Sequence, residues 1–164
     1  MKMRLLTLLC LAATFAAPGF SSQAKAGDGP IRVLFLGHES EHHNSNLYYP
    51  MLSRALGRDA IYFDYVTSVE EALGDADYLG KFDALLLYAN HGRIEPHQWK
   101  NPKDFVEGGG GFVPVHCASW CFGNEPGFDK LVGGRFKSHQ GAVFSARISN
   151  GKHPAMKGAV SYTH

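Results

Sequence analysis

The sequence predicts an α/β fold with a doubly wound, mostly parallel sheet, and three observations support this. Four short apolar runs, at residues 31–36, 61–66, 83–88 and 112–115, have the length of buried strands. Segments with helical spacing or helix-capping residues separate the runs. Glycine or proline marks several of the boundaries. Such alternation of strands and helices is typical of a parallel sheet with right-handed crossovers.

The first strand and the helix after it are the clearest elements. Residues 31–36 form a nearly continuous apolar run that ends at Gly37, which suits a strand covered on both faces. After a polar loop, apolar side chains recur at helical spacing over residues 47–56. Pro50 must lie near the first turn of this helix or kink it, and Gly57 ends it.

The second and third strands flank a short helix. Residues 61–66 alternate between apolar and polar side chains, which indicates a strand. Ser68 begins a helix that reaches Leu73, because Ser-Val-Glu-Glu has the pattern of a capping box. Residues 83–88 contain Ala-Leu-Leu-Leu and form the third buried strand.

A further helix precedes the glycine-rich segment. Pro96 suits its first turn, whereas Pro102 is expected to interrupt it. Four glycines at residues 108–111 end the helix. They are not a phosphate-binding loop, because they precede a strand and no Gly-Lys-Ser/Thr follows them.

The last part of the chain contains a fourth and a fifth expected strand. Residues 112–115 form the fourth, and a helix or loop then runs to about Leu131. Residues 141–149 alternate, which predicts a later and more exposed strand. We therefore expect one domain over residues 31–164.

The amino terminus has the pattern of a secretory signal peptide over residues 1–26, followed by a linker at 27–30. A basic start precedes the uncharged apolar run of residues 5–17, and Ala24-Lys25-Ala26 fits a signal-peptidase site. The run is shorter than the ~20 residues of a membrane span, so we expect no stable span after cleavage. We expect a periplasmic or extracellular protein.

The composition shows no sign of a nucleic-acid footprint, so we expect no nucleic-acid partner. The chain has 164 residues, a formal net charge of +1 and 19% charged residues, and no basic run or stripe appears. Histidine is frequent, with nine residues that all follow residue 37.

Several histidines follow expected strands. His38 follows the first strand, with Glu39, His42 and His43 in the same loop, His91 follows the third, and His116 ends the fourth. Ligands of such sheets bind beyond the carboxyl ends of the strands, where topology brings these residues together. His139 follows Gly-Gly-Arg-Phe and is a further candidate. Any single loop histidine could equally be a solvated polar residue.

Two kinds of chemistry suit a convergent histidine group. His38, His91, His116 and His139 are candidate ligands of a divalent metal such as zinc. His116, His38 and Glu39 are candidate acid–base residues near neutral pH. Trp99, Trp120, Tyr48 and Tyr49 could stack on a sugar ring, although packing in the core or at its rim explains them equally well.

Cys117 is a weaker candidate nucleophile. At a tight strand-to-helix turn the reactive residue has small neighbours two positions away on either side, a pattern that suits His116 better. We expect the Cys117 side chain to point away from the pocket mouth and pack against the sheet. Cys117 and Cys121 lie four residues apart, where a disulfide would be strained, so we expect free or metal-associated thiols.

The glycine-rich strand and the histidine after it resemble a known family. Residues 108–119, Gly-Gly-Gly-Gly-Phe-Val-Pro-Val-His-Cys-Ala-Ser, are similar to the central motif of ThuA-like (trehalose-utilisation) proteins. Leu-Val-Gly-Gly-Arg-Phe at residues 131–136 with His139, Gly37-His38 and Asn90-His91-Gly92 also fit. The resemblance extends over residues 31–164.

The resemblance implies a flavodoxin-like fold similar to class I glutamine amidotransferases. It also implies a histidine where those enzymes carry their cysteine nucleophile, so this chain is not expected to be an active amidotransferase. It implies a role in carbohydrate utilisation, with trehalose or a related or oxidised glycoside as substrate and a sugar oxidoreductase as partner.

Two departures from the family stand out. Pro114 occupies a position that is usually glycine, and the sequence stops where members continue into an acidic segment, so we expect a carboxy-terminal truncation. The leading hypothesis is an exported hydrolase or acid–base enzyme acting on a sugar. The alternative is a non-catalytic sugar-binding or accessory domain.

Overall fold

Four parallel strands form the sheet of this protein, in the order β2-β1-β3-β4. The computed structural model describes residues 29–141, 143, 145 and 147–156. The strands are β1 (Ile31–Leu36), β2 (Ile61–Val66), β3 (Ala84–Leu87) and β4 (Gly111–Pro114). This order is that of a flavodoxin-like sheet and confirms the predicted α/β fold.

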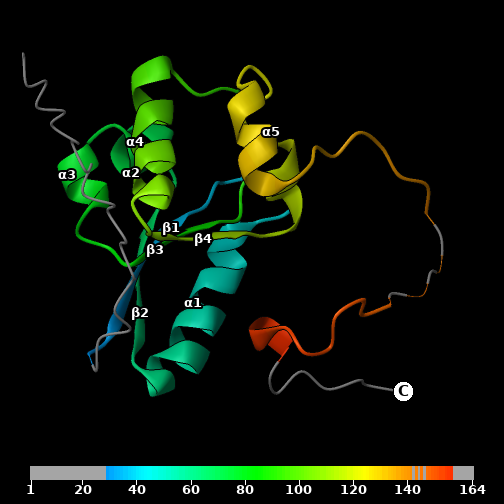
Figure 1. Cartoon of the computed structure of the whole chain (residues 1–164), viewed down its shortest axis with the longest axis horizontal. Helices are drawn as coiled ribbons and strands as arrows, with labels where there is room; N and C mark the ends of the chain where they lie inside the picture. Colours follow the sequence, from blue (N-terminus) through cyan, green and yellow to red (C-terminus); the bar gives the residue numbers. More distant parts are fainter. Residues whose placement is uncertain (1–28, 142, 144, 146, 157–164) are drawn as a thin grey trace, which may run out of the picture.

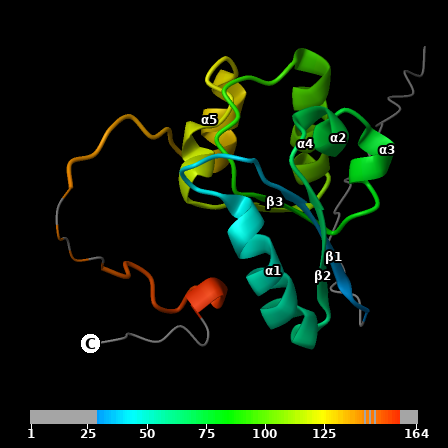
Figure 2. The same cartoon turned by 180° about the vertical axis from the view of Figure 1, so that it is seen from behind.

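Helices cover both faces of the sheet, as Figures 1 and 2 show. Helix α1 (Ser45–Leu56) covers one face. The opposite face is covered by α2 (Val69–Leu73), α3 (Ala76–Leu79), α4 (Pro96–Glu107) and α5 (Pro126–Val132). Doubly wound sheets are covered in this way because each buried strand exposes apolar side chains on both faces.

Strand β1 contributes to both halves of the core. Leu34 and Leu36 belong to the cluster under α2 to α5, whereas Val33 and Phe35 belong to the cluster under α1. Phe35 is fully buried, and its ring makes edge contacts with three aromatic rings of the α1 side, those of Tyr49, Phe63 and Tyr65. Burial on both faces explains why the sequence of β1 shows no polar alternation after Arg32.

The register places the ends of the strands at one edge of the sheet. Leu36 pairs with Val66 and with Leu87, and Leu87 pairs with Pro114. The loops after β1, β3 and β4 therefore begin side by side, so that histidines in these loops can contribute to one site.

Two sequence predictions about secondary structure are wrong. Helix α4 continues through Pro102, which was expected to interrupt it. Pro102 is buried and α4 packs against α2 and α3, so tertiary packing outweighs the backbone hydrogen bond that proline cannot donate. The strand expected at residues 141–149 is absent from the described residues of that segment, which are exposed and have no neighbouring strand to pair with.

The signal peptide expected at residues 1–26 lies outside the described residues, as do the first two residues of the expected linker. Within the described part of the chain, none of the helices has the length and apolar character that crossing a bilayer requires.

Candidate functional site

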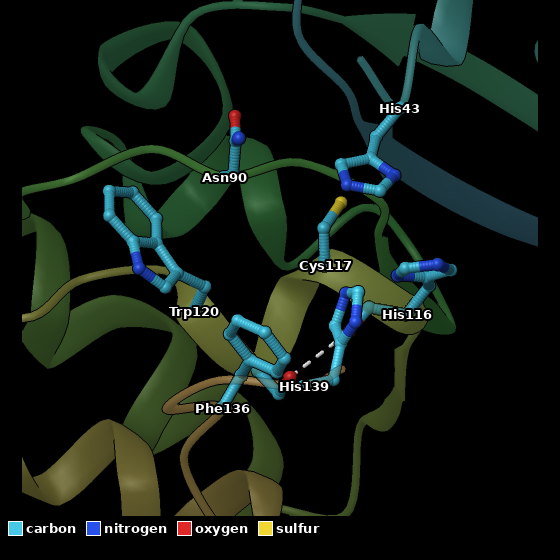
Figure 3. A pocket seen from close by; sticks show the side chains of 8 residues that line it. His43, Asn90, His116, Cys117, Trp120, Phe136 and His139 are labelled. Carbon is cyan, nitrogen blue, oxygen red and sulfur yellow. Dashed lines mark hydrogen bonds between the residues drawn. The ribbon is translucent and has the colours of Figure 1, made fainter. Parts of the chain in front are cut away.

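A pocket of about 240 Å³ lies at the carboxyl edge of the sheet (Figure 3). Its residues come from the loops after β1, β3 and β4 and from the segment after α5. The lining residues are His43, Asn90, His116, Cys117, Ser119, Trp120, Phe136 and His139. The histidines therefore gather where the topology predicts a ligand site.

His116 is the first residue of the short 3-10 helix η2 (His116–Trp120), which is separated from β4 only by Val115. Its φ of 49° is left-handed, a conformation that histidine adopts more readily than most residues. The Ala118 N–H donates to the Val115 carbonyl at 3.0 Å and closes the turn. Such strained strand-to-helix turns present one side chain at the sheet edge, as the sequence pattern around His116 indicates.

His43 is the neighbour of His116 in the pocket. Their ring centroids lie 4.5 Å apart, and His43 is also left-handed, with a φ of 61°. Burial lowers the pKa of His43, and the nearby imidazole of His116 lowers it further. His43 therefore favours its neutral form, which keeps a lone pair for accepting a proton.

His38 lies behind the pocket and not in its wall. Only 6% of its surface is exposed, and both of its ring nitrogens have backbone partners. Nδ1 accepts the N–H of Asn90 at 3.4 Å, which leaves Nε2 to donate to the His43 carbonyl at 2.8 Å. The imidazole of His38 thus connects the two loops that supply His43 and Asn90.

His91 is the second histidine of this inner layer. Its ring centroid lies 6.0 Å from that of His38, and its Nε2 lies 2.9 Å from the Gly37 carbonyl oxygen, which accepts a hydrogen bond from it. The ring stacks on Phe122. Burial lowers the pKa of His91, although the hydrogen bond to Gly37 opposes this shift.

The lowered pKa of His91 should make the fold sensitive to acid. Between the lowered pKa and the ordinary value of about 6.5, the unfolded chain binds more protons than the native one. The stabilisation is therefore complete above about pH 6.5 and is lost as the pH falls through the folded-state pKa. We expect urea unfolding at pH 5.5 and 7.5 to show a smaller pH dependence in His91→Gln than in the wild type.

Glutamine can still donate to the Gly37 carbonyl but cannot take up a proton. The variant therefore keeps this hydrogen bond and removes only the protonation of residue 91. His43 has a pKa shifted in the same direction, so His91→Gln should remove only part of the effect. His153→Gln serves as the control, because His153 is exposed. An unchanged pH dependence in His91→Gln would contradict this account.

Of the two remaining predicted site residues, one lies in the pocket wall and the other does not. His139 lines the pocket, with its ring 5.5 Å from that of Phe136. Glu39 is exposed and does not line the pocket. The four predicted metal ligands thus divide into a pocket pair, His116 and His139, and an inner pair whose imidazoles bond to the backbone.

This division does not fit a single metal ion held by all four histidines. Among the residues that the structure describes, no three His, Cys, Asp or Glu side chains gather in an arrangement suited to a metal ion. Metal binding stays a prediction, and elemental mass spectrometry of the purified protein tests it.

The prediction for the direction of Cys117 is wrong. Cys117 lines the pocket, and Figure 3 shows its sulfur directed toward the His43 ring. The left-handed turn at His116 redirects the chain, so the next side chain enters the pocket. Burial raises the pKa of the Cys117 thiol, which disfavours the nucleophilic thiolate.

Cys121 is the second free thiol and belongs to the core. It is fully buried, and its Sγ donates to the Ala89 carbonyl at 3.0 Å. Burial raises the pKa of Cys121 to about 12. No disulfide joins Cys117 and Cys121 in the structure, whereas metal association of these thiols stays a prediction.

Sequence reasoning placed His43 at this edge of the sheet but gave it no catalytic or metal-binding role, and it did not assign the pocket residues Asn90, Ser119 and Phe136 to the site. His43 stands in the same polar loop as His38, and Asn90 precedes His91, so proximity in the sequence was an available signal. The sequence does not show which histidine of the first loop turns inward, because this depends on backbone conformation.

The comparisons with known proteins agree with this fold. The family model for ThuA, described as trehalose utilisation, matches residues 32–163. The chain belongs to the ThuA family. No curated protein sequence matches it.

Two solved structures share the fold of this ThuA-family chain. A ThuA-like protein from Bacteroides uniformis ATCC 8492 superposes with a TM-score of 0.58 at 18% identity, over 82% of this chain and 58% of its own. A ThuA-like protein from Parabacteroides merdae ATCC 43184 gives a TM-score of 0.53 at 20% identity, over 62% of this chain and 38% of its own. This chain therefore spans less than two thirds of the length of either protein.

Proposed function

We propose that this ThuA-family chain is an exported enzyme that acts on a small carbohydrate through acid–base catalysis by His43 and His116. The observation that carries the proposal is the contact of their rings, 4.5 Å apart, in a pocket of about 240 Å³. The description of the family, trehalose utilisation, favours a glycoside as substrate. The basic start, apolar run and Ala-Lys-Ala site of residues 1–26 support export.

The two histidines have different roles in this proposal. His43 is the general base, because its lowered pKa leaves the imidazole neutral near physiological pH. His116 is the general acid, which hands a proton to the leaving oxygen. His38 is a positioning residue, since its Nε2 holds the His43 carbonyl and its ring does not reach the pocket wall.

The side chains of the pocket favour an oxidised glycoside over an ordinary one. Most enzymes that hydrolyse unmodified glycosides use two carboxylates, and no Asp or Glu is among the described lining residues. A carbonyl at C3 of the sugar acidifies the C2–H bond, so the neutral imidazole of His43 can remove that proton. A C1=C2 double bond then forms as the C1–oxygen bond breaks, and His116 gives its proton to the leaving oxygen, which completes an elimination. A sugar oxidoreductase partner would supply such a substrate.

The test is to compare trehalose with a keto derivative of trehalose in deuterium oxide. We expect the protein to exchange the C–H proton beside the carbonyl and to release a free monosaccharide from the keto sugar only, both observable by NMR. Binding of either sugar without exchange or release would instead assign a non-catalytic sugar-binding domain. If the protein neither bound nor turned over either sugar, a carbohydrate function at this pocket would be excluded.

A further inference from the structure

Two large aromatic side chains remain exposed beside the histidine pair. Trp120 is 48% and Phe136 40% exposed, and both line the pocket. Figure 3 shows them on the side of the pocket away from His43. A single exposed aromatic residue is ordinary, but two that line one pocket mark a surface that a ligand can cover.

The backbone holds these two aromatic residues in a fixed relation. The Phe136 N–H donates to the Ser119 carbonyl at 3.0 Å, and Nη1 of Arg135 donates to the Trp120 carbonyl at 3.2 Å. Adjacent residues of one segment are thus bonded to adjacent residues of the other.

Arg135 anchors this junction to the core. Its Nε donates to Asp129 Oδ2 at 2.9 Å, its Nη2 lies 2.6 Å from Asp129 Oδ1, and Nη2 also donates to the Cys121 carbonyl at 3.0 Å. The segment after α5 is therefore attached to the turn that carries Trp120 before any ligand arrives. Such preorganisation lowers the entropy lost on binding.

We infer that Trp120 and Phe136 form a stacking subsite for one pyranose ring of the substrate, which rests on the carbohydrate function proposed above. The faces of aromatic rings are electronegative and attract the partially positive C–H bonds on the face of a sugar. Hydroxyl groups at the sugar rim can bond to Asn90 and Ser119, which line the same pocket. The volume of about 240 Å³ is below the ~300 Å³ at which pockets for drug-sized ligands begin, so it suits a single ring.

Stacking of this kind also sets stereochemical specificity. A glucose-configured ring carries its ring hydroxyls equatorially, so both of its faces present C–H bonds. An axial hydroxyl interrupts one face and places a polar group against an aromatic surface, where it loses hydrogen bonds to water. The subsite should therefore prefer methyl β-D-glucopyranoside over methyl β-D-allopyranoside, whose 3-hydroxyl is axial.

Ligand-observed NMR titrations with these two methyl glycosides test the subsite. We expect Trp120→Ala and Phe136→Ala each to weaken binding of the glucoside by about threefold to tenfold, the range given by aromatic stacking energies. Trp120→Phe should recover part of the affinity. Tyr62→Ala is the matched control, because Tyr62 is an exposed aromatic residue on β2, at the opposite edge of the sheet. With the keto sugar, Trp120→Ala should raise KM more than it lowers kcat.

The outcomes separate the subsite from the proposed function. If wild-type protein binds the glucoside and both alanine variants bind it equally well, the stacking subsite is wrong while the carbohydrate function stands. Equal affinity of the wild type for the two glycosides would also overturn the subsite. If the wild type binds neither methyl glycoside and does not act on the keto sugar, both the subsite and the proposed function fail.

Discussion

The His116→Asn protein should fold normally and lose turnover of the keto sugar by about 10²- to 10⁴-fold, the contribution of a well-placed general acid. Asparagine is the appropriate replacement because it tolerates the left-handed backbone that His116 adopts, with φ of 49°. It cannot donate a proton to a leaving oxygen at neutral pH. Steady-state kinetics with the keto sugar, together with circular dichroism, measure the effect.

The pH profile of the same variant provides a second readout. Burial and the imidazole of His116 both lower the pKa of His43, so removing His116 should let that pKa rise toward its ordinary value. The acid limb of kcat/KM, which reports the free general base, should therefore move to higher pH in the residual activity. An unmoved limb would show that His116 does not lower the pKa of His43 or that His43 is not the base that this limb reports.

Two controls belong to this experiment. His97→Asn replaces an exposed histidine outside the pocket and should leave kcat/KM unchanged. The double variant His43→Asn/His116→Asn should be little worse than either single variant, because an acid and a base that act as a unit are not additive. Full activity in His116→Asn would remove His116 from the mechanism.

Gly37→Ala should be among the most damaging single changes to the fold. A Cβ at Gly37 would collide with the Ser45 hydroxyl and would lie 2.5 Å from the Tyr65 ring. Ser45 cannot yield easily, since its Oγ accepts the His38 N–H at 2.7 Å and donates to the His38 carbonyl at 3.0 Å. Overpacking of a buried site costs about 1–3 kcal/mol, and we expect the upper part of this range or more.

Urea unfolding of Gly37→Ala measures this loss, with Gly57→Ala as the matched control. Gly57 has a right-handed φ of −59°, and a Cβ there would meet nothing within 4 Å. The control should be neutral or slightly stabilising, because alanine reduces the entropy of the unfolded chain. If the two variants were equally stable, the close contact around Gly37 would not exist as described.

Gly37→Ala should also affect the site through the inner histidines. The Gly37 carbonyl accepts the hydrogen bond from His91, and Ser45 holds the backbone of His38. A displaced Ser45 would shift His38, whose Nε2 holds the His43 carbonyl. We therefore expect any soluble Gly37→Ala protein to lose turnover as well as stability.

The main elements of the fold could be predicted from short-range patterns. The apolar run of β1, the alternation of β2 and the Ser68 cap of α2 appear in the structure at the predicted residues. These signals are local, because strand burial and helix capping depend on residues a few positions apart. The prediction that Pro102 interrupts a helix was wrong because it depends on a non-local effect. Packing of α4 against other helices outweighs the tendency of proline to break a helix.

The candidate site could likewise be predicted only in part from the sequence. The sequence alone determined that histidines follow β1, β3 and β4, and parallel topology then requires them to meet at one edge of the sheet. Only the tertiary structure decided that His38 and His91 turn inward to backbone carbonyls while His43 faces His116. Side-chain direction there depends on positive φ angles and on hydrogen bonds between loops about 50 residues apart, as between His38 and Asn90. Such contacts form only after the sheet has brought the loops together, so no pattern of neighbouring residues encodes them.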